Sequence, residues 1–292
     1  MRRRDFLQLD VFADRPGTGN PLAVVLDARD LDTAAMQAFA HWTNLSETTF
    51  VLPPQDPSAS YGVRIFTPRQ ELPFAGHPSV GTAHAVLEAG LAQAREGRLV
   101  QECAAGLLPL QVAGEGPARR IAVRAPRGQA VAPPVPHEAA LDAALAGRVR
   151  GALVPALIDN GPRWWVVELA DEAQVRTMAP NLSAIAALTD ATGAVGLAVF
   201  GRAAPGSKHG LAVRAFCPAD GIPEDPVTGS ANAAIAAWLH QNHALGALGA
   251  DYLASQGREV GRDGRVHLRV DADGEAWVGG STQTVIRGTV DW

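Results

Sequence analysis

Three ionisable side chains in this sequence, Glu47, His77 and Asp225, have the chemistry needed to move a proton. Glu47 opens the apolar run Thr48–Leu52, and a carboxylate at the mouth of an apolar strand is a candidate general acid or base. A solvated residue at the end of a strand is the alternative interpretation of Glu47. Asp225 precedes Pro226 in a loop that otherwise consists mostly of small and apolar residues.

His77 and Asp225 each lie just before a predicted helix. Proline favours the first helical position, so Pro78 makes His77 the expected N-cap of the first helix. Ser230 is the expected N-cap of the second helix. The positive end of a helix dipole disfavours a charged imidazole, which would leave His77 neutral and able to take or give a proton.

The starts of these two helices have a second possible use. The first backbone N–H groups of a helix have no partner within the helix, and they form the positive end of its dipole. Two such helix starts facing one cleft would hold an anion such as a substrate carboxylate. Ordinary capping of two structural helices is the alternative interpretation.

An internal repeat predicts how these loops are positioned. When the chain is shifted by 150 residues, residues 63–83 align without a gap on residues 213–233 and share six identities. The identical residues are Val, Arg, Phe, Pro, Pro and Ala, and composition alone does not explain two shared prolines with an Arg-x-Phe frame. Each copy has a strand, a short proline-bounded loop and then a helix.

The helix of each copy is expected to be buried, because it is apolar on all sides and rich in alanine and glycine. The first should run from about Pro78 to Ala89 and the second from about Ala231 to Asn242. Further helices are expected at Thr33–Trp42, Glu138–Leu145 and Pro180–Leu188. Strands are expected at Phe6–Phe12, Ala23–Leu26, Thr48–Leu52, Leu107–Val112, Ile121–Ala125, Trp164–Leu169, Gly196–Phe200, Val266–Val270 and Ala276–Gly279.

These elements predict an α+β fold of two pseudo-symmetric halves. Each half is expected to be a curved, mostly antiparallel sheet or barrel around its buried central helix. We expect the N-terminal half to span residues 1–128 and to be joined by a C-terminal strand, 283–292, with residues 129–282 forming the other half. The cleft between two related halves is the expected ligand site.

Composition excludes several classes of function. The chain has 292 residues, is 47% hydrophobic and 19% charged, and carries a net charge of −5, which gives no electrostatic reason to expect a nucleic-acid partner. The arginines in Met1-Arg-Arg-Arg4 lack the apolar segment of an export signal, and no run of about 18 apolar residues predicts a membrane span. We therefore expect a soluble, cytoplasmic protein.

Residue counts also restrict the chemistry. Lys208 is the only lysine and lies in a glycine-flanked turn, which disfavours Schiff-base catalysis. Two cysteines are too few for a disulfide framework or a cysteine-rich zinc site, and no further pair of candidate ligands accompanies His240 and His243. No phosphate-binding glycine motif or nucleophile elbow is present. The sequence thus predicts no metal and no cofactor.

The motifs resemble one protein family along nearly the whole chain. Those that carry the resemblance are Gly19-Asn20-Pro21, Asn44-Leu-Ser-Glu-Thr-Thr-Phe-Val51, Arg64-x-Phe-Thr-Pro68, Glu71-Leu-Pro-Phe-Ala-Gly-His-Pro78, Glu224-Asp-Pro-Val-Thr-Gly-Ser-Ala231 and Gln256-Gly257 with Gly261-Arg262. They resemble the PhzF family of phenazine-biosynthesis-like proteins, which has the diaminopimelate-epimerase-like fold. The resemblance implies the same two-half architecture as the repeat.

The resemblance also implies roles for individual residues. Glu47 would move a proton from C3 to C1 of a ring substrate such as trans-2,3-dihydro-3-hydroxyanthranilate, without a metal or organic cofactor. His77 and Asp225, from opposite halves, would assist the transfer and position the substrate. Further hydrogen bonds would come from Ser46, Gly76, Gly229 and Ser230, the last two near the substrate carboxylate. The resemblance also suggests a homodimer.

The leading hypothesis is a cofactor-independent isomerase of a small carboxylate-bearing substrate. A racemase of the same fold that uses two facing thiols is excluded, because neither Cys103 nor Cys217 lies at the start of a central helix in this sequence. Two alternatives stay open: an isomerase or epimerase of another small acid, and a binding protein that kept the cleft without turnover.

Overall fold

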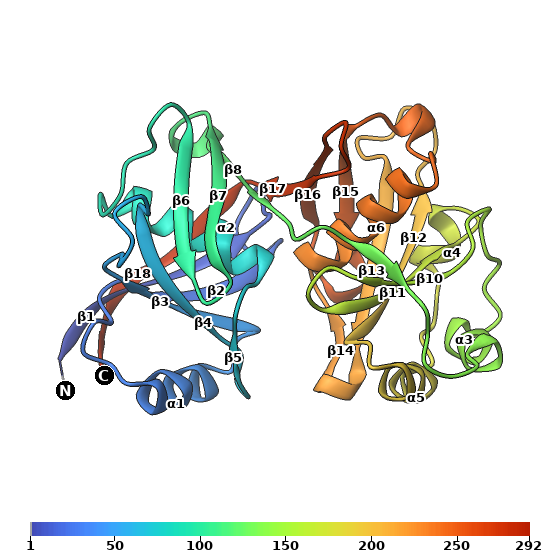
Figure 1. The fold of residues 1–292 in the computed structure, drawn as a ribbon, viewed down its shortest axis with the longest axis horizontal. Helices are drawn as coiled ribbons and strands as arrows, with labels where there is room; N and C mark the ends of the chain where they lie inside the picture. Colours follow the sequence, from blue (N-terminus) through green and yellow to red (C-terminus); the bar gives the residue numbers. More distant parts are fainter. Residues whose placement is uncertain (1) are drawn as a thin grey trace. The chain divides into compact units, whose positions relative to one another are not determined.

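The chain folds into two compact units, and the computed structural model describes residues 2–292. Unit 1 comprises Met1–Arg124 together with Gly279–Trp292, and unit 2 comprises Ala125–Val278. The chain crosses from unit 1 to unit 2 after Arg124 and returns within strand β17 (Ala276–Gly280). Each unit has its own series of paired strands and its own buried helix, and each is described separately below (Figure 1).

Unit 1 is built on one continuous series of paired strands. The strands are β18 (Thr282–Asp291), β1 (Arg3–Val11), β2 (Asn20–Val25), β3 (Glu47–Leu52), β4 (Tyr61–Phe66), β5 (Glu71–Leu72), β6 (Arg98–Cys103), β7 (Gly106–Ala113) and β8 (Arg120–Arg124). In this order each strand pairs with the next, except that β4 pairs with both β5 and β6. The pairs β2–β3 and β4–β6 are parallel and the others are antiparallel.

Unit 2 repeats the pairing pattern of the first eight of these strands. Its strands are β9 (Gln129–Val131), β10 (Ala156–Asp159), β11 (Arg163–Glu168), β12 (Gly196–Arg202), β13 (Leu211–Cys217), β14 (Ile222–Asp225), β15 (Asp251–Gln256) and β16 (Gly264–Val270). Each strand pairs with the next, except that β13 pairs with both β14 and β15. The pairs β11–β12 and β13–β15 are parallel, as the corresponding pairs β2–β3 and β4–β6 are in unit 1. The predicted α+β fold of two related halves is confirmed.

A central helix is enclosed by the strands of each unit. Helix α2 (Gly76–Glu88) packs against β1, β2, β3, β4, β6, β8 and β18, and its residues 77–86 are buried (Figure 1). At Gly81 a Cβ atom would lie 2.5 Å from a methyl of Leu22 and 2.8 Å from a methyl of Val11. Glycine therefore lets α2 approach β1 and β2 closely.

Helix α6 (Gly229–Gln241) takes the central position in unit 2, where it packs against β9, β10, β11, β12 and β16. Six of its thirteen residues are alanine or glycine, and the small side chains allow strands to surround it on several sides. The prediction that both central helices are buried is confirmed.

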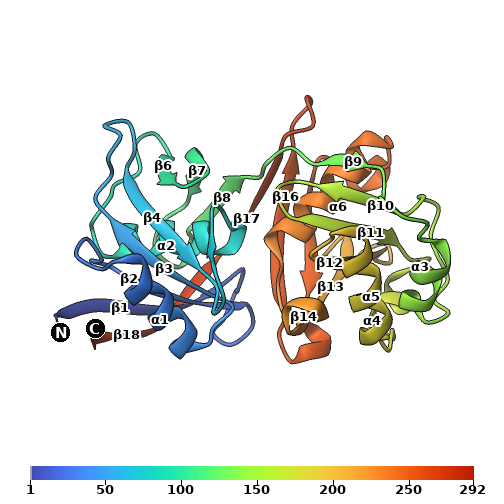
Figure 2. The ribbon, with the colours of Figure 1, turned by 60° about the horizontal axis from the view of Figure 1, so that its bottom comes forward.

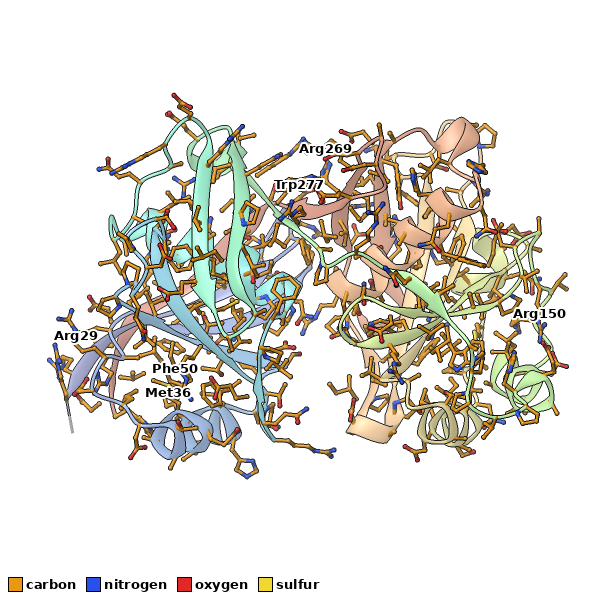
Figure 3. The ribbon with its side chains drawn as sticks, viewed as in Figure 1. Arg29, Met36, Phe50, Arg150, Arg269 and Trp277 are labelled. Carbon is orange, nitrogen blue, oxygen red and sulfur yellow. The ribbon has the colours of Figure 1, made fainter. Side chains whose placement is uncertain are left out.

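Peripheral helices cover the outer faces of the sheets. In Figure 2, α1 (Thr33–Thr43) lies along the strands of unit 1, and Met36 of this helix packs in one core cluster with Phe39 and Phe50 (Figure 3). In unit 2 the helical elements are α3 (Glu138–Leu145), α4 (Glu172–Arg176) and α5 (Leu182–Thr192). Short 3₁₀ turns occur at η1 (Gly116–Ala118), η2 (Pro218–Asp220), η3 (Gly246–Leu248) and η4 (Arg258–Val260).

The repeat extends to an ion pair in each unit. Arg64 bonds Glu71 through two nitrogens and its guanidinium lies 5.2 Å from the ring centre of Phe66. In unit 2, Arg214 bonds Glu224 in the same way and lies 5.0 Å from the ring centre of Phe216. The duplicated interactions are stronger support for the repeat than the identities in the sequence.

The sequence alignment of the repeat is wrong beyond these strands. Ile65 pairs with Leu72, and its counterpart Ala215 pairs with Asp225, so the offset between the two copies grows from 150 to 153 residues. Helices α2 and α6 then both begin with glycine, Gly76 and Gly229. The three additional residues fall between β13 and the end of β14, which the 3₁₀ turn η2 joins. Asp225 is therefore the counterpart of Leu72.

Candidate functional site

Glu47 and His77 meet inside unit 1. Glu47 is the first residue of β3, and His77 is the second residue of α2. Atom Oε2 of Glu47 lies 3.3 Å from Nε2 of His77, and only 17% and 6% of the two side chains are exposed. A carboxyl and an imidazole at this separation, largely shielded from water, are suited to exchanging a proton.

The opposite side of the His77 ring is held by the backbone. The carbonyl oxygen of Pro21 in β2 accepts a hydrogen bond from the ring, and since Nε2 faces Glu47, this bond belongs to Nδ1. A carbonyl can only accept, so Nδ1 carries a hydrogen and the neutral ring turns the lone pair of Nε2 toward Glu47.

Burial keeps this imidazole neutral. Loss of water around the ring lowers the pKa of His77 from 6.5 to about 3, and the bond to the Pro21 carbonyl only partly opposes that change. The expectation of a neutral His77 is thus confirmed in direction, but its cause is burial rather than the helix dipole. At neutral pH the ring is an acceptor at Nε2.

The two residues that precede this pair in the sequence are half-buried. Ser46 lies in a bend just before β3, next to Glu47, and Gly76 is the first residue of α2, next to His77. Unit 1 thus holds four of the seven predicted site residues at the beginning of one strand and one helix.

Unit 2 holds the other three predicted residues. Asp225 ends β14 and is buried, and Gly229 and Ser230 are the first two residues of α6. Atom Oδ2 of Asp225 accepts a hydrogen bond of 2.5 Å from the hydroxyl of Thr228. The carboxylate therefore has a fixed donor within its own loop.

Ser230 is held by a residue of β11 and by a residue of the loop between β10 and β11. The indole Nε1 of Trp164 donates to the Ser230 hydroxyl oxygen at 3.1 Å, and the amide of Asn160 donates to the Ser230 carbonyl at 2.9 Å. Because an indole N–H can only donate, the Ser230 hydroxyl accepts on one side and keeps its hydrogen for another acceptor. A hydroxyl in this state, beside the N–H groups at the start of α6, is suited to an anion.

The predicted N-caps are wrong. Helix α2 is capped by Ala75 and α6 by Thr228, so His77 and Ser230 are both second residues of their helices. Pro78 fits at the third position because the N–H groups of a first helical turn need no partner within the helix. Neither cap uses a side-chain oxygen, and Thr228 turns its hydroxyl to Asp225 instead.

The cysteines and acidic clusters offer little alternative chemistry. Cys103 ends β6 and Cys217 ends β13; both are free thiols, and neither lies at the start of α2 or α6. The carboxylates of Asp271, Asp273 and Glu275 lie within 4.8 Å of one another. Asp271 accepts hydrogen bonds from Arg269 and Trp277, and the same Arg269 stacks on the Trp277 ring, so these contacts already explain its position (Figure 3).

Comparison with known proteins decides the family. The family model described as phenazine biosynthesis-like protein, PhzC-PhzF, matches residues 9–289. The chain belongs to this family. Among residues 2–292, no helix has the length and apolar character needed to span a membrane.

Individual relatives match over almost their whole length. The chain is 36% identical to trans-2,3-dihydro-3-hydroxyanthranilate isomerase of Pseudomonas aeruginosa, over 92% of this chain and 91% of that protein. It is 32% identical to antisense-enhancing sequence 1 of Schizosaccharomyces pombe, over 99% of each chain. The crystal structure of a PhzF-family phenazine biosynthesis protein of Bacillus anthracis covers 100% of both chains, with a TM-score of 0.84 and 25% identity.

Sequence reasoning missed the residues that hold the site residues in place. Pro21 acts through its carbonyl, which no side-chain pattern reveals. Trp164 lies in an expected strand, but its indole holds Ser230, a residue 66 positions away in the sequence. Gln256 is part of a motif that carries the family resemblance, but its partners, Asp225 and Thr228, are far away in the sequence.

Proposed function

We propose that this protein is a cofactor-independent isomerase that moves a proton within a small carboxylate-bearing substrate. The contact between Glu47 and His77 is the observation that carries the proposal. Membership of the PhzF family and relatives named as isomerases support it. In this proposal both units contribute to one substrate site.

Glu47 is the proposed base that takes the substrate proton and returns it. The neutral His77 offers a lone pair at Nε2, so a proton received by Glu47 can be shared with the ring before it is delivered. Burial of this pair limits loss of the proton to water, which a transfer within one molecule requires. Ser46 and Gly76 are the proposed substrate contacts beside the pair.

Asp225 is the proposed second polar group for proton transfer and substrate positioning. Gly229 and Ser230 are proposed to bind the substrate carboxylate, since the first N–H groups of α6 and the Ser230 hydroxyl hydrogen all favour a negative partner. We further propose that the protein is cytoplasmic and forms a homodimer. Light scattering of the purified protein would test the dimer.

Hydrogen exchange tests the proposal. The protein is incubated in deuterated water with trans-2,3-dihydro-3-hydroxyanthranilate and a panel of other small carboxylic acids, and deuterium incorporation is followed by mass spectrometry. We expect exchange with at least one acid, and a loss of about 100-fold or more in Glu47→Gln. Glu115→Gln, an exposed change of the same type, is the control.

Two results would contradict this assignment. Exchange that survives Glu47→Gln would remove Glu47 as the base. Saturable binding of an acid without any exchange would favour the binding-protein alternative over an enzyme.

A further inference from the structure

Gln256 lies at the centre of a buried polar network in unit 2. It is the last residue of β15 and is fully buried. Its amide nitrogen donates to the carbonyl of Asp225 at 3.1 Å and to the hydroxyl of Thr228 at 2.9 Å. Its amide oxygen accepts from the backbone N–H of Thr228 at 3.0 Å and from the side chain of Asn232 at 2.8 Å. All four hydrogen-bonding positions of the amide are therefore used.

Two backbone groups fix which way this amide points. The N–H of Thr228 can only donate and the carbonyl of Asp225 can only accept, so the oxygen and nitrogen of Gln256 cannot exchange places. The nitrogen of Gln256 must then donate to the Thr228 hydroxyl. That hydroxyl has one hydrogen, and it points to Oδ2 of Asp225.

We propose that Gln256 is a positioning residue, which acts through Thr228 to hold the Asp225 carboxylate as a hydrogen-bond acceptor in one orientation. This inference rests on the proposed function, in which Asp225 serves the proton transfer. Gln256 donates to the Thr228 hydroxyl, and this hydroxyl donates to the Asp225 carboxylate. The lone pair of Oδ2 that faces Thr228 already accepts this hydrogen bond, so a proton taken up by Asp225 must bind elsewhere on the carboxylate.

The segment after Gln256 packs directly against the Asp225 loop. Gly257 has φ +96°, and a Cβ atom there would lie 2.4 Å from the carbonyl oxygen of Pro226. A Cβ atom at Gly264 would lie 2.3 Å from a methyl of Val227. Glycine at both positions therefore lets the backbone come close enough for Gln256 to reach the loop.

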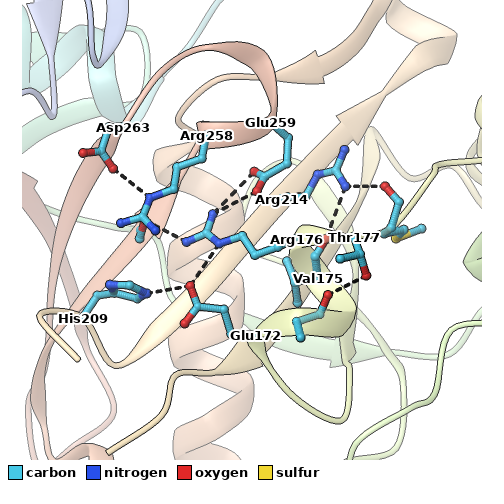
Figure 4. Close-up of polar contacts among 12 residues, drawn as sticks. Glu172, Val175, Arg176, Thr177, His209, Arg214, Arg258, Glu259 and Asp263 are labelled. Atoms are coloured by element: carbon cyan, nitrogen blue, oxygen red, sulfur yellow. Dashed lines mark hydrogen bonds and ion pairs between the residues drawn. The ribbon is translucent and has the colours of Figure 1, made fainter. Parts of the chain in front are cut away.

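Ion pairs hold this segment from the other side (Figure 4). Arg176 of α4 bonds Glu259 at 3.3 Å, Glu172 at 3.0 Å and the hydroxyl of Ser255 at 2.9 Å. Arg258 closes the turn by bonding Asp263 at 3.0 Å. The residues on both sides of Gln256 are thus tied down, which restricts the movement of its side chain.

Unit 1 contains a buried glutamine that lacks this arrangement and so provides a control. Gln101 in β6 is also fully buried and donates to the hydroxyl of Ser79 at the start of α2. Its oxygen accepts from Tyr61, and the counterpart of Asp225 in this unit is Leu72. Gln101 therefore secures a helix without orienting a carboxylate.

Four substitutions test the proposal by rates of substrate proton exchange. Gln256→Glu keeps the shape but removes the donor, and Thr228→Val removes the hydroxyl. We expect kcat to fall about 10- to 100-fold in each, with a smaller change in KM, because misplacing a reacting group by about 1 Å costs up to 100-fold. Thr228→Ser keeps the hydroxyl and should stay within about threefold of wild type. Gln101→Glu should lose activity only in proportion to its unfolded fraction, measured by urea denaturation.

A crystal structure of Gln256→Glu gives a readout that does not depend on turnover. We expect Asp225 to turn away from Thr228 in the variant, because the introduced carboxylate accepts the Thr228 hydroxyl hydrogen. An Asp225–Thr228 bond that persists, or a Thr228→Val enzyme as active as Thr228→Ser, would overturn the proposal. Absence of exchange in the wild type would instead refute the proposed function and leave the crystallographic test in place.

Discussion

The imidazole of His77 lies between two oxygen atoms, with Nε2 lying 3.3 Å from Oε2 of Glu47 and Nδ1 bonded to the carbonyl of Pro21. This arrangement fixes the tautomer of the ring. It also means that protonation of His77 must occur at Nε2, in the buried space that it shares with Glu47. Burial lowers the pKa of His77, and the two contacts decide which nitrogen of the ring takes the proton.

The buried, neutral His77 should therefore make the protein less stable as the pH falls. The pKa of His77 is 6.5 in the unfolded chain and about 3 in the native protein. Between these values the unfolded chain binds a proton that the native protein does not, so stability falls as pH falls through this window.

His77→Gln removes this contribution. The free energy of unfolding in the variant, measured in urea between about pH 4 and 6, should change less steeply with pH, by up to about 1.4 kcal/mol per pH unit. His41→Gln, an exposed change of the same type, serves as the control. Parallel slopes for wild type and His77→Gln would contradict the buried, neutral assignment.

Adjacent tryptophans provide a matched test of anion binding at α6. Trp164→Phe removes the donor to the Ser230 hydroxyl, whereas Trp165→Phe removes a similar bond to Thr192 in a separate part of the core. If Ser230 binds a carboxylate, benzoate binding measured by calorimetry should weaken about 5- to 10-fold in Trp164→Phe, equivalent to the loss of one hydrogen bond of about 1 kcal/mol. Trp165→Phe should bind benzoate as the wild type does, and equal affinities in both variants would count against the role of Ser230.

The duplicated ion pairs should differ in their effect on stability. Arg214 and Glu224 are 5% and 8% exposed, and Arg214 also donates to the carbonyls of Val175 and Met178. Glu224→Gln leaves a buried guanidinium without its charged partner, and we expect a loss of about 3 kcal/mol.

Glu71→Gln is the matched change in unit 1, where the pair is about one-third exposed. It should cost about 1 kcal/mol or less, since water screens the remaining charge. Urea denaturation of both variants measures the difference. Equal losses would show that exposure does not decide the strength of these pairs.

The close contact of α2 with β1 and β2 predicts that Gly81→Ala destabilises the protein, although helix propensity alone would favour alanine. Alanine is normally favoured over glycine inside a helix by about 0.5–1 kcal/mol. At Gly81 the added methyl meets Leu22 and Val11, which are fully buried, and overpacking of about 1–3 kcal/mol should exceed that gain. Gly288→Ala, where no atom lies within 4 Å, should change the thermal midpoint little. A stabilised Gly81→Ala variant would show that β1 and β2 move apart without cost.

Regular patterns in the sequence were sufficient for much of the fold. The alternation in Val266–Val270 predicted β16, whose residues are alternately buried and half-buried, and Thr33–Trp42 predicted α1 to within one residue. The short helix α4 was missed, as were the strands β5, β6, β9, β10, β14 and β15. Helix α4 has only five residues, and the strand β15 ends in the polar pair Ser255 and Gln256, whose burial depends on partners elsewhere in the chain.

The local errors have a common physical cause. Ala75 caps α2 without a side-chain oxygen, and Thr228 caps α6 while its hydroxyl serves Asp225, so neither cap follows the usual residue preference. The gapless alignment of the repeat is wrong because unit 2 has three additional residues around η2. The match of Pro73 with Pro223 in that alignment is therefore a coincidence. The helix caps and the alignment of the repeat depend on contacts between distant parts of the chain. Local sequence patterns do not reveal those contacts.

The pairing of β18 with β1 has a consequence for how the protein is made. Arg3 lies opposite Asp291, so one edge of β1 stays unpaired until residues 282–291 have been synthesised. Residues 125–278 form a continuous segment and can complete their own sheet earlier during synthesis. Until then the nascent β1 exposes unpaired backbone groups, the kind of edge that chaperones or a neighbouring chain would bind.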